Sequence, residues 1–299
     1  MKALDKWRAD AASIRANGWR IAMWSTTAQD PERPWLLLIH GFPTSSWDWS
    51  AIWPDLEARF NLAAIDMLGF GLSEKPRGVK FRIVDQADLQ EMALEQLGVG
   101  DAHIFAHDYG VSVAQELLAR HNENTLSFSI KSLCFLNGGL YPELHRPLLV
   151  QKLAVSPIGP AIGALLTKAS LRRSFDQIFG PETKASDEEI DGHWTLFSEH
   201  GGRRVFHKLL DYIPQRRENR TRWVGALESS RTPLALINGG ADPISGAHLY
   251  EHFSAALPTA YARLLPDIGY YPHTEAPDRV LEAYFDFVET IEPRSVSAT

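Results

Sequence analysis

One five-residue segment of this chain, AHDYG from Ala106 to Gly110, constrains its fold more than any other. An apolar run over residues 103–106 leads into the segment, and residues 111–120 leave it with the pattern of a helix. Small residues on both sides of the centre let the chain turn sharply from strand to helix. The segment therefore predicts a strand, a tight turn and a helix, with the side chain of Asp108 standing at the bend over a sheet.

The carboxylate at this bend limits the chemistry that is open to the chain. Asp108 is ionised at neutral pH, needs no base to activate it, and can displace a leaving group from saturated carbon to give an ester. Attack on an ordinary carboxylic ester would instead give a high-energy anhydride, which disfavours ester and peptide hydrolysis. We therefore expect an alkylating substrate.

The rest of the chain alternates short apolar runs with longer amphipathic ones, a pattern typical of a mostly parallel sheet flanked by helices. An α/β fold with eight strands is expected. Residues 138–229 break the alternation and contain helix signals such as the capping box that begins at Ser186. We expect a core domain of residues 1–137 and 230–299, with residues 138–229 inserted after the sixth strand as a helical cap. The expected strands are 19–24, 35–40, 62–66, 102–107, 130–137, 233–238 and 260–265, and the expected helices are 46–59, 84–97, 111–120, 246–256 and 277–291.

The composition disfavours several classes of partner. A net charge of −7 argues against nucleic acid and against an anionic membrane surface. No apolar run approaches the roughly 18 residues that span a bilayer, and the N-terminal residues lack the apolar core of a signal peptide. The single cysteine, Cys134, cannot form an internal disulfide. We expect a cytoplasmic enzyme, monomeric or homodimeric, that acts on a small molecule.

Two later segments supply candidates for cleaving an alkyl-enzyme ester, which requires water, a base and an acidic residue that orients the base. Asp242 follows an apolar run on a loop at the end of a strand, and His273 follows the last expected strand. The order of nucleophile, acid and histidine is that of an elbow-type hydrolytic site, and the carboxyl ends of parallel strands are where open α/β sheets place their sites. Asp108, Asp242 and His273 are therefore the predicted catalytic residues.

The segment HGFP, from His40 to Pro43, predicts a backbone N–H directed at the nucleophile. We assign an oxyanion hole to the amides of Phe42 and Tyr109. Further candidates for substrate contact are His40, Pro43, His107 and Tyr141, although a structural role explains His40 more readily.

Motifs for bound groups are missing from the sequence. The Gly-x-Gly at residues 69–71 continues with Glu74 where a dinucleotide fingerprint needs a third glycine. There is no phosphate-loop motif, cysteine cluster or His-Glu-x-x-His. We expect neither a cofactor nor a metal.

Taken together, these motifs resemble the α/β-hydrolase superfamily, in particular its epoxide hydrolase and haloalkane dehalogenase branch, whose members use an aspartate nucleophile. The resemblance covers nearly the whole chain. Several stretches are more similar still to the mesoderm-specific transcript proteins, namely residues 40–49, 107–120, 130–139, 145–153 and 222–227.

Within that branch, the His-Gly-x-Pro run is similar to epoxide hydrolases, which use cap tyrosines to hydrogen-bond and protonate the epoxide oxygen. Tyr212 resembles the second of these tyrosines by its place before the end of the cap, and a hydroxyl donates a hydrogen bond without carrying charge into an apolar pocket. The first tyrosine has no clear match, although Tyr141 lies near the cap entrance. The basic run Arg216, Arg217, Arg220 and Arg222 is interpreted as a solvated cap surface.

The resemblance implies a cofactor-independent epoxide hydrolase. Asp108 would attack an oxirane carbon of an apolar epoxide while Tyr212 donates to the oxygen, and His273 with Asp242 would activate the water that releases a vicinal diol. Two alternatives stay open. One is a haloalkane or haloacetate dehalogenase with the same nucleophile, and the other is a hydrolase-fold binding protein without useful turnover.

Overall fold

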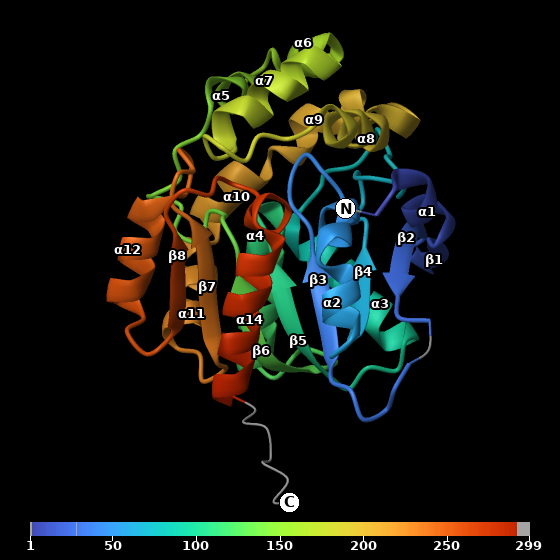
Figure 1. The fold of residues 1–299 in the computed structure, drawn as a ribbon. Coiled ribbons are helices and arrows are strands. Elements are labelled where there is room, and N and C mark those ends of the chain that lie inside the picture. Colours follow the sequence, from blue (N-terminus) through green and yellow to red (C-terminus); the bar gives the residue numbers. More distant parts are fainter. Residues whose placement is uncertain (1, 28, 292–299) are drawn as a thin grey trace, which may run out of the picture.

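The computed structural model describes residues 2–27 and 29–291, which contain an eight-stranded sheet (Figure 1). The sheet has the order β1-β2-β4-β3-β5-β6-β7-β8. β2 runs antiparallel to β1 and β4, and all the other neighbouring pairs are parallel. The predicted mostly parallel sheet of eight strands is confirmed. The strands are β1 (Ala12–Ala16), β2 (Trp19–Ser25), β3 (Trp35–Ile39), β4 (Asn61–Ile65), β5 (Asp101–Ala106), β6 (Ser129–Phe135), β7 (Leu234–Gly239) and β8 (Tyr261–Leu265).

The sequence predicts seven of these strands to within two residues at each end, but it does not predict β1. Most side chains of β1 are exposed or half-buried, so no apolar alternation marks the strand. The available signal was the turn that joins β1 to β2. Asn17 and Gly18 have φ values of 49° and 82° there, the conformation that an Asn-Gly hairpin turn adopts.

Helices cover both faces of the sheet (Figure 1). Buried side chains of α3, α4 and α12 form one apolar cluster with the sheet, and those of α1, α2 and α14 form the other. The predicted helix 46–59 divides into η1 and α2, because Pro54, which has no amide hydrogen, lies in the first turn of α2. The helices are α1 (Leu4–Ala9), η1 (Ser46–Ala51), α2 (Trp53–Glu57), α3 (Ile83–Gln96), α4 (Tyr109–Asn122), α12 (Ala247–Ala256), α13 (Pro272–Glu275) and α14 (Pro277–Ile291).

Between β6 and β7 the chain forms helices and no strand. Figure 1 shows α5 to α9 above the carboxyl ends of the strands, where they cover the sheet as a cap would. The capping box at Ser186 is present, since its hydroxyl accepts from the amide of Glu189 and the Glu189 carboxylate accepts from the amide of Ser186. The last of these helices, α11, packs on α4 of the core. The helices are α5 (Leu149–Ala154), α6 (Gly159–Leu165), α7 (Lys168–Ile178), α8 (Asp187–Ser198), η2 (Glu199–Gly201), α9 (Gly202–Leu209), α10 (Tyr212–Glu218) and α11 (Arg220–Glu228).

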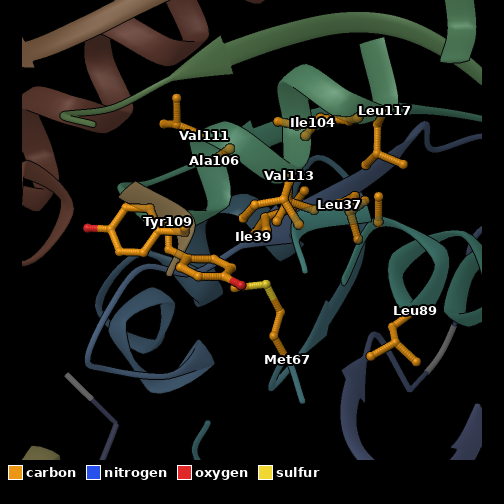
Figure 2. Packing of buried hydrophobic residues seen from close by; sticks show 14 of the residues in the cluster. Leu37, Ile39, Met67, Leu89, Ile104, Ala106, Tyr109, Val111, Val113 and Leu117 are labelled. Atoms are coloured by element: carbon orange, nitrogen blue, oxygen red, sulfur yellow. The ribbon is translucent and has the colours of Figure 1, made fainter. Parts of the chain in front are cut away.

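The turn between β5 and α4 rests on closely packed apolar side chains (Figure 2). Ala106, Tyr109 and Val111, which flank the turn, are completely buried. Asp108 itself has φ 46° and ψ −105°, a region that residues other than glycine rarely adopt. A Cβ at Gly110 would lie 2.5 Å from the carbonyl oxygen of Ile39, so only glycine allows this close approach. The packing around the turn therefore holds a strained backbone at Asp108 in place.

Candidate active site

The two carboxylate oxygens of Asp108 have different surroundings. Oδ2 accepts a hydrogen bond from the amide of Phe42 at 2.9 Å, and the nearby amide of Tyr109 helps to lower the pKa of the carboxylate. The two amides that the sequence predicts as an oxyanion hole therefore meet at one carboxylate. The turn after β5 supplies one of them, and the loop after β3 supplies the other.

The other oxygen, Oδ1, accepts a hydrogen bond from the hydroxyl of Tyr270 at 2.5 Å. Tyr270 lies in the loop between β8 and α13, and it is buried, as is Asp108. Sequence reasoning missed this residue because it searched the last loop for an imidazole. The available signal was position, since Tyr270 lies closer to the end of β8 than His273 does.

Arg216 also lies beside Asp108, which corrects the interpretation of the basic run as a solvated surface for this residue, whereas Arg217 and Arg220 are exposed. The side chain of Arg216 is 1% exposed. Nη2 donates to the backbone oxygen of Asp108 at 2.8 Å and lies 3.9 Å from Oδ1, while Nε donates to Ser112 Oγ at 2.6 Å. Helical spacing was the missed signal, because Arg216 falls on the same face of α10 as the buried Tyr212 and Ile213.

Burial dominates the electrostatics of the site. It raises the pKa of Asp108 above its ordinary value, and the Arg216 guanidinium, the Tyr270 hydroxyl and the two amides oppose that shift. Burial, followed by the nearby charge of Asp108, raises the pKa of Tyr270 well above that of a free tyrosine. Tyr270 therefore keeps its proton at neutral pH and donates a hydrogen bond to Asp108.

The structure does not pair His273 with Asp242. Asp242 accepts hydrogen bonds from Asn137 Nδ2, from the amides of Ile244 and Ser245 and from Ser245 Oγ. Neither ring nitrogen of His273 has a hydrogen-bond partner within the described part of the chain.

The reason is local. Pro272 begins the short helix α13, and His273 belongs to that helix. Its ring packs against Trp49, with the ring centroids 4.5 Å apart. The loop residue Tyr270, five positions after the end of β8, contacts Asp108 instead.

Asp108 and Tyr270 line a mostly apolar cavity of about 70 Å³. Phe42 and Pro43, which are joined by a cis peptide bond, line it as well. The remaining wall consists of Leu148, Gln151, Leu166, Thr167, Ser170, Leu171, Ser174, Phe175, Ile178, Trp194, Phe197, Phe206 and Ile244.

Three predicted substrate contacts lie outside this wall. His40 Nδ1 donates to the carbonyl of Gly41, and its Nε2 accepts from the amide of Met67, so both nitrogens are used within the fold. His107 Nε2 lies 2.7 Å from the backbone oxygen of Tyr270. The ring of Tyr141 contacts His252. None of the three side chains lines the cavity, and their contact with a substrate stays a prediction.

Tyr212 lies near the nucleophile but is not among the residues that line the cavity. Its ring contacts those of Phe42 and Tyr109, and the Arg216 guanidinium lies over the ring at 4.4 Å from the centroid. The nearby charge of Asp108 adds to burial in raising the pKa of its hydroxyl. The predicted donation from Tyr212 to a substrate stays a prediction.

Comparison with known families decides the membership of the chain. The family model described as "alpha/beta hydrolase fold" matches residues 34–277. The chain belongs to the α/β hydrolase fold family. Across the described residues, this hydrolase has no helix that is both long and apolar enough to cross a membrane.

Individual relatives agree with this membership. The hydrolase is 38% identical over 296 residues to the mesoderm-specific transcript protein of Mus musculus, an alignment that covers 96% of this chain and 88% of the mouse protein. It is also similar to the solved structure of the haloalkane dehalogenase DbeA from Bradyrhizobium elkani USDA94, with a TM-score of 0.78, 22% identity and 94% and 98% of the two chains covered. The solved epoxide hydrolase CorEH gives a TM-score of 0.74 at 20% identity, with 94% and 99% covered. At such identities the two solved structures support the fold alone.

Proposed function

We propose that this hydrolase converts an apolar epoxide to a vicinal diol through a covalent ester on Asp108. The observation that carries the proposal is the environment of the carboxylate beside a mostly apolar cavity. Oδ1 accepts from the Tyr270 hydroxyl, Oδ2 accepts from the amide of Phe42, and both Asp108 and Tyr270 line the cavity. Oδ1 is thus the oxygen that attacks, and Oδ2 is the oxygen that later carries negative charge.

Ring opening needs a nucleophile on carbon and a proton for oxygen. Oδ1 of Asp108 forms a bond to an oxirane carbon as the bond from that carbon to the ring oxygen breaks. The Tyr270 hydroxyl turns from Oδ1 to the ring oxygen and gives it a proton, leaving a tyrosinate. The transfer is favourable because an alkoxide is a stronger base than a tyrosinate.

Ester hydrolysis uses the same tyrosine in the reverse direction. The tyrosinate of Tyr270 removes a proton from water, whose oxygen bonds to Cγ of Asp108. The amides of Phe42 and Tyr109 stabilise the negative charge on Oδ2. The bond from Cγ to Oδ1 then breaks. Oδ1, which leaves with the product, takes the proton of the hydroxyl that water added to Cγ. The diol departs and the carboxylate of Asp108 is restored.

This sequence of steps assigns to Tyr270 the base role that the sequence analysis gave to His273. The raised pKa of Tyr270 supports the assignment, because a group that holds its proton tightly is a strong base once it has lost it. Asp242 keeps a supporting role in the loop after β7, where its carboxylate accepts four hydrogen bonds.

A single turnover in ¹⁸O-labelled water tests the proposal. Excess enzyme is mixed with each member of a panel of small apolar epoxides, such as styrene oxide, and both products are analysed by mass spectrometry. We expect an unlabelled diol and one ¹⁸O atom in the peptide that contains Asp108, because the diol takes its oxygen from the carboxylate. Direct attack of water on the epoxide would place the label in the diol instead.

The matched control is Asp108→Asn, which keeps the size of the side chain and should form no diol. Diol formation by this variant at the rate of the parent protein would refute the covalent mechanism. Halide release from haloalkanes, with no diol from any epoxide, would replace the proposal with dehalogenation by the same nucleophile.

A further inference from the structure

Three buried polar side chains from separate elements lie close together. Asp48 comes from η1, His107 from the end of β5, and His273 from α13. One potential ligand atom from each of the three lies within 4.8 Å of those of the other two, and all three side chains are buried. No step of the proposed reaction uses them.

These side chains have unused lone pairs. Oδ1 of Asp48, Nδ1 of His107 and both ring nitrogens of His273 are buried without a hydrogen-bond partner among the described residues. Buried polar atoms in folded proteins are nearly always paired, and leaving one unpaired costs about 1–3 kcal/mol. Four such atoms close together are therefore expected to share a bound group that pairs with them.

A fourth group points at the same place. His193, from α8 of the cap, has its Nδ1 3.7 Å from Oδ1 of Asp48, too far for a hydrogen bond. This nitrogen is also buried and unpartnered. The ring of His193 packs against Trp47 and Phe175, which hold it in this orientation.

The outer contacts of the cluster are those of a metal site. His107 Nε2 lies 2.7 Å from the carbonyl oxygen of Tyr270, a contact in which the ring nitrogen donates and which leaves the lone pair on Nδ1. Thr44 Oγ1 donates to Oδ2 of Asp48, leaving Oδ1 available. Metal-bound histidines and carboxylates are typically oriented by such second contacts to carbonyl and hydroxyl groups.

We propose that Asp48, His107 and His273, with His193 as the fourth ligand, bind a zinc ion that fastens the elbow to η1, α13 and the cap. Imidazole nitrogen and carboxylate oxygen in fourfold coordination are the donors that Zn²⁺ takes, at roughly 2.0–2.2 Å. Mg²⁺ and Ca²⁺ prefer oxygen ligands throughout. The ligand atoms of Asp48, His107 and His273 lie within 4.8 Å of one another, so each of the three needs to move by less than about 1 Å to bind one metal. Nδ1 of His193 lies 3.7 Å from Oδ1 of Asp48.

The site is distinct from the cavity beside Asp108, because none of its four residues lines that cavity. Its sequence pattern is also unlike a metal motif. Residues 48, 107, 193 and 273 come from separate segments, so no fixed spacing marks them. This explains why the sequence analysis expected no metal.

Metal content and thermal unfolding test the inference. The full chain is refolded with Zn²⁺ or with a chelator, excess metal is removed, and bound zinc is measured by elemental mass spectrometry. We expect about one zinc per chain after loading and a higher melting temperature for the loaded protein, since a ligand that binds only the folded state stabilises it. Co²⁺ loading should give the visible absorption bands of fourfold coordination.

Matched variants locate the site. Asp48→Asn and His273→Gln should weaken zinc binding by more than the ~10–100-fold that loss of an outer contact causes, whereas His207→Gln, at a half-buried histidine of α9, should bind as the parent does. The parent protein's own zinc content and melting shift decide the matter even where a variant fails to fold. A parent protein that takes up no zinc, or Asp48→Asn and His273→Gln variants that bind it undiminished, would overturn the proposal and leave water as the occupant.

Discussion

If Asp108 attacks the substrate as proposed, the hydrogen bond from Tyr270 should set the pH at which it becomes active, and Tyr270→Phe removes this bond with little change in shape. The bond is 2.5 Å long and joins two buried side chains. Burial is the largest cause that raises the pKa of Asp108, and the Tyr270 hydroxyl is one of the groups that lower it. Without the hydroxyl, the pKa of Asp108 must therefore rise further.

The size of the shift follows from the charge of the acceptor. A hydrogen bond to an ionised group contributes about 1.5–3 kcal/mol, and one pKa unit corresponds to about 1.4 kcal/mol. The pKa of Asp108 should therefore rise by about 1–2 units in Tyr270→Phe. Because only the carboxylate attacks, the pH at which alkylation reaches half its maximum should rise by the same amount.

The assay isolates attack from proton donation by using a benzyl halide, whose leaving group needs no proton. Formation of the ester on Asp108 is followed by quenched mass spectrometry across a pH series. Tyr271→Phe is the matched control, because its hydroxyl is also buried but donates to the carbonyl of Phe42 at 3.1 Å. The control should keep the midpoint of the parent protein. An unchanged or lowered midpoint in Tyr270→Phe would refute the reasoning.

Two further predictions concern stability. Burial raises the pKa of Asp242 to about 6, so the folded chain holds this proton while the unfolded chain releases it near the ordinary value of about 4. The parent protein should lose about 3 kcal/mol of unfolding free energy from this group as pH rises from about 4 to 7, whereas Asp242→Asn should not. Denaturant unfolding at several pH values checks this prediction. A difference in unfolding free energy between the two proteins that does not change with pH would contradict it. At Gly41, an added Cβ would lie 2.8 Å from both Asp108 Cβ and His107 Nδ1, so Gly41→Ala should destabilise the protein by about 1–3 kcal/mol, whereas Gly78→Ala, with no atom within 4 Å of the added Cβ, should be neutral in the same measurement.

The fold could be predicted from sequence because its determinants are local. Each buried strand of the parallel sheet is a short apolar run, and each flanking helix has its own periodicity. The AHDYG segment also predicts its own tight turn, because Ala106 and Gly110 are small residues on either side of the strained Asp108. The strand β1 escaped prediction because its side chains face solvent on an edge, where burial imposes no pattern.

Tertiary structure alone decided which side chains contact Asp108. Local sequence places both Tyr270 and His273 after β8, but only the turn into α13 directs the tyrosine to Asp108 and the imidazole toward Trp49. The same holds for Arg216. Its charge predicts an exposed side chain, but the packing of α10 against the turn at Asp108 buries it.

The physical reason is that the sequence by itself determines the backbone pattern, which depends on neighbours along the chain. Contacts among residues 48, 107, 193 and 273, or between 108, 216 and 270, depend on how separate elements pack. Sequence therefore identified the aspartate at the elbow and the amides that surround it. Only the packed molecule showed that a tyrosine hydroxyl, rather than a histidine, lies against its carboxylate.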